Sequence, residues 1–418
     1  MMTINKLTKI AGIGLLLTGL TALNAEAGDN SSLLEKLVEK GVITQAEANA
    51  LLLEESNGGN NDKVPSWVSR LTLKGDLRLR FEHTHDGEPS DVTSAEDRWR
   101  YRFRLGGIAD LENGFKVGFR FATGDSGQAV SSNQTFGGDF GRDKFNLDQA
   151  YAAWKQDQDW GSTSGLTMYG GKMPNFANTG WKISGALFDS DITPEGIEVH
   201  YGGLETGLTT LGFHGGAYLM EGEDDPSKQY STMIMAQVTS QTKLSDTLAM
   251  DLGVGLYGID SNDLAGQGNG NGNTSGQGYT PLMIDLAFSY KAAIPIKAYG
   301  TWVDNQQADS MENGWITGIK FGSAKKAGDW QAKVEYVSLE KDAIWDELAD
   351  DQGGAFGIDS TSTGYGTGTN FEGVIFQGKY NLYDNVQTAL SLWFTESEDG
   401  ASSSDDNTRL QADLIFKF

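Results

Sequence analysis

Apolar and polar residues alternate along most of the chain after residue 70, and the pattern is clearest at the C-terminal end. Between residues 409 and 418 the odd positions are mostly polar, whereas the even positions carry Leu410, Ala412, Leu414, Phe416 and Phe418. A period of two residues with one apolar face is typical of a half-buried β-strand. No stretch of helical periodicity interrupts the strand pattern after Arg70.

The alternation predicts sixteen strands of roughly ten residues, which is the length that a tilted strand needs to cross a bilayer. Their expected bounds are 70–84, 96–110, 115–123, 143–157, 166–172, 193–202, 207–219, 230–243, 246–258, 280–291, 294–304, 313–323, 329–341, 370–382, 385–396 and 407–418. Bacterial single-chain barrels contain an even number of antiparallel strands. The fold class is therefore expected to be all-β, a transmembrane antiparallel β-barrel of about sixteen strands.

The predicted connections support this fold because short turns alternate with long loops. The turns are tight, as at Glu112-Asn113-Gly114, and the long polar loops are 85–95, 124–142, 173–192, 220–229, 259–279, 305–312, 342–369 and 397–406. Short periplasmic turns and long external loops are the expected asymmetry, which places both termini in the periplasm. Strands of two soluble β-sandwiches would also show alternating apolar and polar residues. However, that fold would not explain why short turns and long loops alternate along the chain.

The phase of the alternation predicts which side chains face lipid. In 329–341, Trp330, Ala332, Val334 and Tyr336 are expected outside, and Gln331, Lys333 and Glu335 inside. In 385–396, the expected lipid-facing residues are Val386, Leu390, Leu392 and Phe394.

The N-terminal region divides into an export signal and a helical segment. Residues 1–27 combine basic Lys6 and Lys9, a short apolar run and an Ala25-Glu26-Ala27 cleavage site, as secretory signal peptides do. An N-terminal membrane anchor is the alternative. Residues 28–66 predict a short periplasmic helical segment, with a capping box at Thr44–Glu47, followed by a linker. The barrel is expected to occupy residues 67–418.

Composition narrows the possible functions. The chain has 10 Trp, 14 Tyr, 19 Phe and 55 Gly, which suits aromatic girdles and glycine-rich strands. It has no cysteine, so disulfides and thiolate metal sites are excluded. The net charge of −25 argues against nucleic acid as a partner, because binding it requires clustered basic surface.

Basic residues nevertheless gather on three neighbouring predicted strands. Seven of the ten arginines fall between positions 78 and 120, and each shares a strand face with at least one other basic residue. This expected basic wall comprises Arg78, Arg80, Arg98, Arg100, Arg102, Arg104, Lys116 and Arg120. Such charges cannot face lipid, so the wall is expected to line a water-filled lumen.

The loop 173–192 differs from the other long loops because it contains bulky apolar residues, namely Phe176, Trp181, Ile183, Leu187 and Phe188. Folding the loop into the barrel would bury them. It would also bring Asp189, Asp191 and Glu195 opposite the arginines across water, which would create a charged constriction. A solvated external loop is the alternative.

Three segments carry a resemblance to a known family. Gly171–Phe176, Leu187–Gly196 and the helical stretch Leu33–Ala48 resemble the bacterial "putative porin" family of sixteen-stranded outer-membrane barrels. The resemblance implies a passive diffusion channel, commonly a homotrimer, set in outer-membrane lipid and lipopolysaccharide. It also implies that Phe418 is the signal read by the barrel-assembly machinery.

Catalytic and metal sites are not expected. His83 and His85 are interpreted as lumen or rim residues, and His200 and His214 as isolated. The acidic loops, including Asp346 and Glu347, are interpreted as solvated surface, with Ca²⁺ or Mg²⁺ bridging to lipopolysaccharide as the alternative. No Ser/His pair with an orienting third group is evident, so neither an enzyme nor a cofactor is predicted. A general diffusion porin for small hydrophilic solutes is favoured. A channel selective for anions or oligosaccharides, and a structural or adhesive barrel with a blocked lumen, remain alternatives.

Overall fold

The computed structural model describes residues 38, 70–86, 95–127, 129–182, 184–185, 187–221, 231–260, 273–274, 277–349, 368–396, 398 and 407–418. The expected signal peptide and linker lie outside these residues. Of the predicted helical segment only Val38 is described, and it is helical. Among the described residues, no helix is long and apolar enough to cross a membrane.

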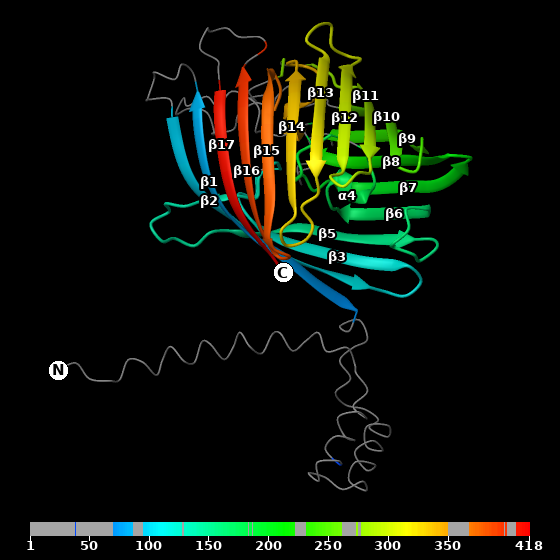
Figure 1. Ribbon diagram of the computed structural model, residues 1–418, viewed down its shortest axis with the longest axis horizontal. Helices are drawn as coiled ribbons and strands as arrows, with labels where there is room; N and C mark the ends of the chain where they lie inside the picture. Colours follow the sequence, from blue (N-terminus) through cyan, green and yellow to red (C-terminus); the bar gives the residue numbers. More distant parts are fainter. Residues whose placement is uncertain are drawn as a thin grey trace, which may run out of the picture. The chain divides into compact units, whose positions relative to one another are not determined.

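The described chain forms a single antiparallel sheet that closes on itself (Figure 1). Its strands are β1 (Leu71–Asp86), β2 (Ala95–Asp110), β3 (Phe115–Thr123), β4 (Gln134–Thr135), β5 (Phe145–Lys155), β6 (Gly165–Lys172), β7 (Glu195–Thr206), β8 (Thr209–Glu221), β9 (Ser231–Lys243), β10 (Leu248–Asp260), β11 (Pro281–Tyr290), β12 (Ile296–Asn305), β13 (Asn313–Gly322), β14 (Trp330–Leu339), β15 (Phe371–Tyr383), β16 (Val386–Glu396) and β17 (Asn407–Lys417). Two short helices accompany them, α4 (Phe176–Thr179) and the 3₁₀ helix η2 (Asp346–Leu348).

Sixteen of these strands make up the barrel wall, and their bounds match those of the predicted segments to within a few residues. The sequence did not predict β4, a two-residue strand that pairs with β2 at Arg100 and Tyr101. β3, with nine residues, is shorter than the sixteen-residue β2 and pairs only with its second half, from Arg104 to Asp110. β4 pairs with part of the β2 edge that β3 leaves free.

The barrel closes between its first and last strands. β1 pairs with β17 from Asp76–Lys417 to Asp86–Asn407, and with β2 on its other edge. The backbones of Gly75 and Phe418 exchange two hydrogen bonds of 2.7 and 3.0 Å, and the Phe418 ring lies over Gly75. A β-carbon at position 75 would lie 2.4 Å from that ring and 2.7 Å from the Arg104 carbonyl oxygen. The ring can turn aside but the backbone oxygen cannot, so the close approach of β1 and β2 favours glycine there.

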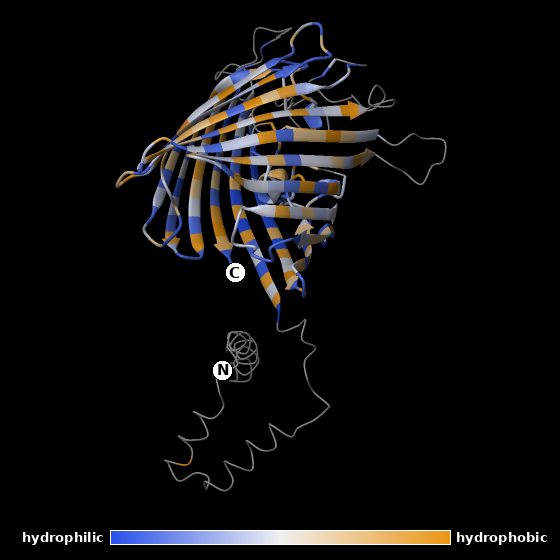
Figure 2. Cartoon of the chain, turned by 90° about the vertical axis from the view of Figure 1, so that its right-hand side faces the viewer, coloured by the Kyte–Doolittle hydropathy of each residue, from blue (hydrophilic) through white to orange (hydrophobic). Residues whose placement is uncertain are grey.

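The outward face of the wall is apolar, and hydropathy alternates along the strands in Figure 2. Leu79, Trp99, Ile197, Ile234 and Trp315 are among the exposed large apolar residues. In β14, Trp330, Val334 and Tyr336 are exposed as expected, whereas Glu335 and Val337 are buried inside. The buried apolar side chains therefore belong mainly to the interior, where loops pack against the wall.

Two connections fill part of the barrel interior. In the segment between β6 and β7, Phe176 packs on Tyr218 of β8, with ring centres 5.3 Å apart, and Phe188 packs on Tyr257 of β10 at 5.4 Å. The start of the β14–β15 connection meets this segment, because the Asp189 amide donates to the Leu348 carbonyl at 2.9 Å. Asp346 is buried there, so its interpretation as solvated surface was wrong. Ile183 lies outside the described residues.

Candidate solute pathway

The basic residues predicted as a wall lie on one face of three adjacent strands, β1, β2 and β3. Direct cross-strand pairing sets Arg80 opposite Arg100 and Arg78 opposite Arg102. Like charges in such positions repel one another unless carboxylates intervene. The intervening carboxylates come from β1 itself, from β5 and β17, and from the segment between β6 and β7. Of these carboxylates, the sequence analysis predicted only Asp191 beside the arginines.

Glu82 of β1 is the centre of the first charge cluster. Its side chain is fully buried, and Oε2 accepts hydrogen bonds from Arg409 at 2.7 Å and from Gln411 at 2.6 Å, both on β17. Its other oxygen accepts from Arg98 and lies 3.6 Å from an Arg100 nitrogen, both on β2. One carboxylate thus joins the three strands at the closure of the barrel.

Asp76 and Asp191 form the second charge cluster. Arg104 Nε donates to Asp76 at 2.7 Å. Arg102 lies between the two carboxylates, with one terminal nitrogen 3.1 Å from an Asp76 oxygen and the other 3.2 Å from an Asp191 oxygen. Arg104 also approaches Asp191 at 3.4 Å, and Asp191 accepts from the Ser132 hydroxyl at 2.8 Å. The segment between β6 and β7 is therefore bound directly to the arginines, and the expectation of a water-filled gap at Asp191 was wrong.

The electrostatic state of Asp191 follows from these neighbours. Burial alone would raise the pKa of this carboxyl, but the positive charges of Arg102, Arg104 and Arg78 outweigh burial. They hold the pKa well below its ordinary value of 3.8. Asp191 is thus a permanent anion at neutral and mildly acidic pH.

The remaining predicted basic residues also have polar partners. Arg80 forms a bidentate pair with Asp413 at 2.7 and 2.8 Å, Arg78 donates to Asn133 at 2.6 Å, and Arg120 donates to Asp148. Lys116 lies at the start of β3, where its Nζ is 3.0 Å from Asp110 Oδ1 and lies over the Trp160 ring.

Two predicted acidic residues do not face the arginines as expected. Asp189 is buried in the segment between β6 and β7 and accepts from the Asp191 amide at 2.6 Å. Glu195 pairs with Lys172 at 2.6 Å and shares the outward face of β7 with exposed Ile197. Its placement beside the arginines is therefore corrected, since the alternation of β7 directs it away from the interior.

The two histidines interpreted as isolated are cross-strand partners. His200 on β7 lies opposite His214 on β8, with 2.9 Å between their Nδ1 atoms, and its other nitrogen lies 3.0 Å from Glu198. His83 lies instead on the outward face, 2.7 Å from Asp97, at the rim. Within the described residues, no group of three or more His, Asp or Glu side chains is arranged to hold a metal ion.

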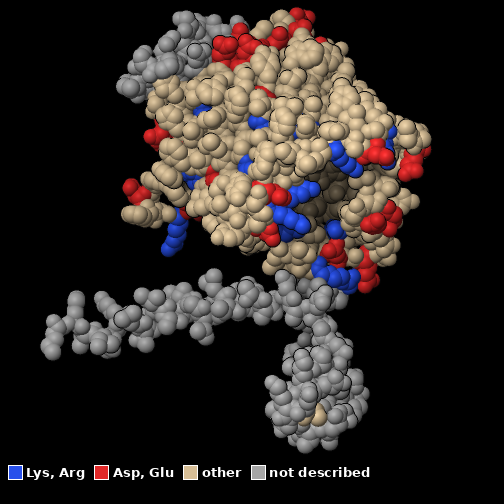
Figure 3. All heavy atoms as spheres, viewed as in Figure 1, with Lys and Arg blue, Asp and Glu red and all other residues tan. Residues whose placement is uncertain are grey.

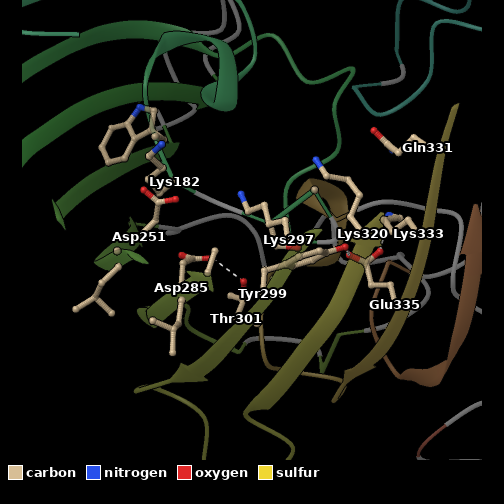
Figure 4. A pocket seen from close by; sticks show the side chains of 18 residues that line it. Lys182, Asp251, Asp285, Lys297, Tyr299, Thr301, Lys320, Gln331, Lys333 and Glu335 are labelled. Carbon is tan, nitrogen blue, oxygen red and sulfur yellow. Dashed lines mark hydrogen bonds and ion pairs between the residues drawn. The ribbon is translucent and has the colours of Figure 1, made fainter. Parts of the chain in front are cut away.

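An interior pocket of about 390 Å³ lies beside the segment between β6 and β7, along the opposite part of the wall from β1. Three lysines of β12, β13 and β14 line it together with Lys182, Asp251, Asp285 and Glu335 (Figure 4). The face shown in Figure 3 is hollowed, and basic and acidic side chains gather around the opening. The sequence interpretation placed Lys333 inside but did not recognise the other lysines as its neighbours.

The comparisons with known proteins concern both family and fold. A family model described as "Putative porin" matches residues 82–280 and 280–418. The high-pH structure of Pseudomonas putida OprB is similar at 12% identity and a TM-score of 0.55, covering 84% of this chain and 96% of that one. A mutant porin of Rh. blastica is similar at 11% identity and a TM-score of 0.42, covering 83% and 100%. No curated protein sequence matches the chain.

Proposed function

This chain belongs to the "Putative porin" family, and on that premise we propose that it is an outer-membrane diffusion channel for small hydrophilic solutes and ions. The supporting observation is the ion-paired contact between Asp191, on a segment inside the barrel, and Arg102 and Arg104 on the wall. Packing of this segment against β8–β10 narrows the interior without closing the charged pocket beside it.

The proposed mechanism is passive. Water and solutes cross a polar interior whose fixed charges select by charge and dipole, as in other channel constrictions. The segment between β6 and β7 acts as the constriction. The basic wall of β1–β3 and Asp191 pair directly, so their charges line the same side of the path.

The proposed setting follows from the apolar outer face and the family. Outer-membrane lipid and lipopolysaccharide surround the barrel, and three copies form a homotrimer. The turns and both ends of the barrel chain face the periplasm, and the end of the barrel from which the long connections start faces outside.

Planar-bilayer recording tests the proposed function. Purified, folded protein should produce stepwise conductance in KCl, and a salt gradient should give a reversal potential that reports ion preference. A structural or adhesive barrel with a blocked lumen would insert without conductance, and that result would contradict the proposal.

Phe418 is proposed as the assembly signal, and its ring can be tested separately from its backbone. Phe418→Ala keeps the two backbone bonds to Gly75 but removes the ring that lies near Phe103. We expect several-fold less heat-modifiable protein in the outer membrane, with in vitro refolding into detergent largely preserved. Equal loss in both assays would instead indicate that the ring stabilises the closure and is not a signal.

A further inference from the structure

Four lysines occupy the same interior face of four successive strands, Lys297 on β12, Lys320 on β13, Lys333 on β14 and Lys379 on β15. The pairing register sets Lys297 directly opposite Lys320, and Lys320 directly opposite Lys333. Lys379 lies opposite Gln331, two residues from Lys333 along the strand. Facing side chains in such pairs have β-carbons about 5 Å apart, so the ammonium groups form one row.

The lysine row is only partly neutralised. Lys333 pairs with Glu335 at 2.7 Å, and Glu335 also accepts from Tyr299 at 2.7 Å. Within the described residues, Lys297, Lys320 and Lys379 form no ion pair. The arginine wall differs, because carboxylates of β1, β17 and the segment between β6 and β7 neutralise it.

A fifth cation approaches from the segment inside the barrel. Lys182 lines the same pocket, and its backbone is fixed to β9 because its amide donates to Gln237 Oε1 at 2.9 Å and its carbonyl accepts from Gln237 Nε2 at 2.6 Å. In Figure 4 the lysine side chains of β12–β14 project to the same side of the sheet, and Lys182 lies beyond them.

The lysines of this arrangement repel one another, and the carboxylates of Asp251, Asp285 and Glu335, which also line the pocket, offset only part of that repulsion. Like charges directly opposite one another on adjacent strands destabilise a sheet. A multivalent anion placed among them removes the repulsion and accepts hydrogen bonds from several ammonium groups at once. The pocket of about 390 Å³ has room for such an anion with part of its hydration shell, since one water occupies about 30 Å³ in the liquid.

We propose that the pocket lined by Lys182 and by three lysines of the row, Lys297, Lys320 and Lys333, is a binding site for small multivalent oxyanions, such as inorganic phosphate or sulfate. The inference rests on the proposed channel function, because it makes this pocket the place where a permeating solute pauses. Hydrogen-bond acceptors and at least two negative charges are the features that the site recognises.

Equilibrium dialysis of inorganic phosphate against folded, detergent-solubilised protein tests binding without any need for conductance. The K297Q/K320Q variant should weaken phosphate binding roughly tenfold, because two charge-assisted contacts are lost. The matched control is K291Q/K326Q, which removes two exposed turn lysines and should bind phosphate like the original protein. Heat-modifiability on gels confirms that both variants are folded.

Inhibition of the chloride current by phosphate in planar bilayers is the second measurement. We expect phosphate to inhibit the original channel and the control variant, and to inhibit K297Q/K320Q only at roughly tenfold higher concentration. Conductance without phosphate binding, or equal binding by both variants, would overturn this site while leaving the channel function intact. Phosphate binding by a barrel that does not conduct would refute the channel function and keep the site. Inhibition by maltose but not phosphate would assign the pocket to sugars and overturn the proposal.

Discussion

Replacing Glu82 with glutamine is expected to cause the largest loss of barrel stability among single charge changes in the interior. The substitution leaves the cations Arg98, Arg100 and Arg409 around a neutral amide at a fully buried position. Breaking a buried ion pair by removing one partner costs about 3–5 kcal/mol, because the remaining charge stays out of water. Here the loss falls on the strands that close the barrel.

The measurement is the temperature at which the folded band disappears on gels, together with urea unfolding in detergent. Glu112→Gln is the matched control, because Glu112 forms an exposed pair with Arg70 at 3.4 Å. Exposed pairs contribute about 0–1 kcal/mol, so this variant should unfold like the original protein. Equal transitions for Glu82→Gln and Glu112→Gln would show that the buried cluster does not stabilise the closure.

The fold could be predicted closely from sequence because alternation is a local property. A strand with one lipid-facing side must place apolar residues at every second position. The sequence pattern therefore indicates both the length of each strand and which of its residues face lipid. Trp330, Val334 and Tyr336 were assigned to the outer face on this ground alone, and they are exposed. The strand β4 escaped prediction because two residues are too few to show a period.

Three charge partners of the arginines, namely Asp76, Glu82 and Asp413, were not predicted, for two different reasons. Asp76 and Glu82 lie on the same face of β1 as Arg78 and Arg80, at the same two-residue spacing, so counting acids as well as bases would have found them. The contact of Asp413 with Arg80 depends instead on barrel closure, which joins residues more than three hundred positions apart.

The histidine pair and the lysine row required the pairing register. His200 and His214 meet only because the β7–β8 hairpin turns around Gly207, with a bulge between Tyr201 and Leu204. Periodicity places a residue on a face of its strand, but it does not say how far each strand is shifted against the next. A set of cations on neighbouring strands therefore became a row only in the structure.

Replacing Asp191 with asparagine is expected to change ion selectivity most among the single substitutions in the interior segments. The variant keeps the size of the side chain but removes the one carboxylate that binds the segment to both Arg102 and Arg104. Two arginines then lack that counter-charge, so the reversal potential in a KCl gradient should move toward anions. Arg102→Gln with Arg104→Gln should move it toward cations, because Asp191 then faces the path alone.

Asp191→Asn is also expected to loosen the segment while leaving the sheet intact. Removing one partner of a buried ion pair costs about 3–5 kcal/mol. Because Asp191 belongs to no strand, the substitution should weaken the attachment of the segment to the barrel wall and not the pairing of the strands. Single channels should therefore show larger current fluctuations, whereas heat-modifiability should change little. Asp309→Asn, at an exposed position in another loop, is the matched control and should alter neither property.

Salt and pH separate this mechanism from a general effect of charge. The selectivity shifts should shrink from 0.1 M to 1 M KCl, because the Debye length falls from about 10 Å to about 3 Å. The neighbouring arginines hold the pKa of Asp191 below 3.8, so its ion pairs are present above that pH and are lost only as the pH falls through the lowered value. Acidification from pH 7 to about pH 5 should consequently not reproduce the Asp191→Asn phenotype. An unchanged reversal potential in both the Asp191 and the arginine variants, in barrels that still conduct, would place the solute path elsewhere and contradict the proposed constriction.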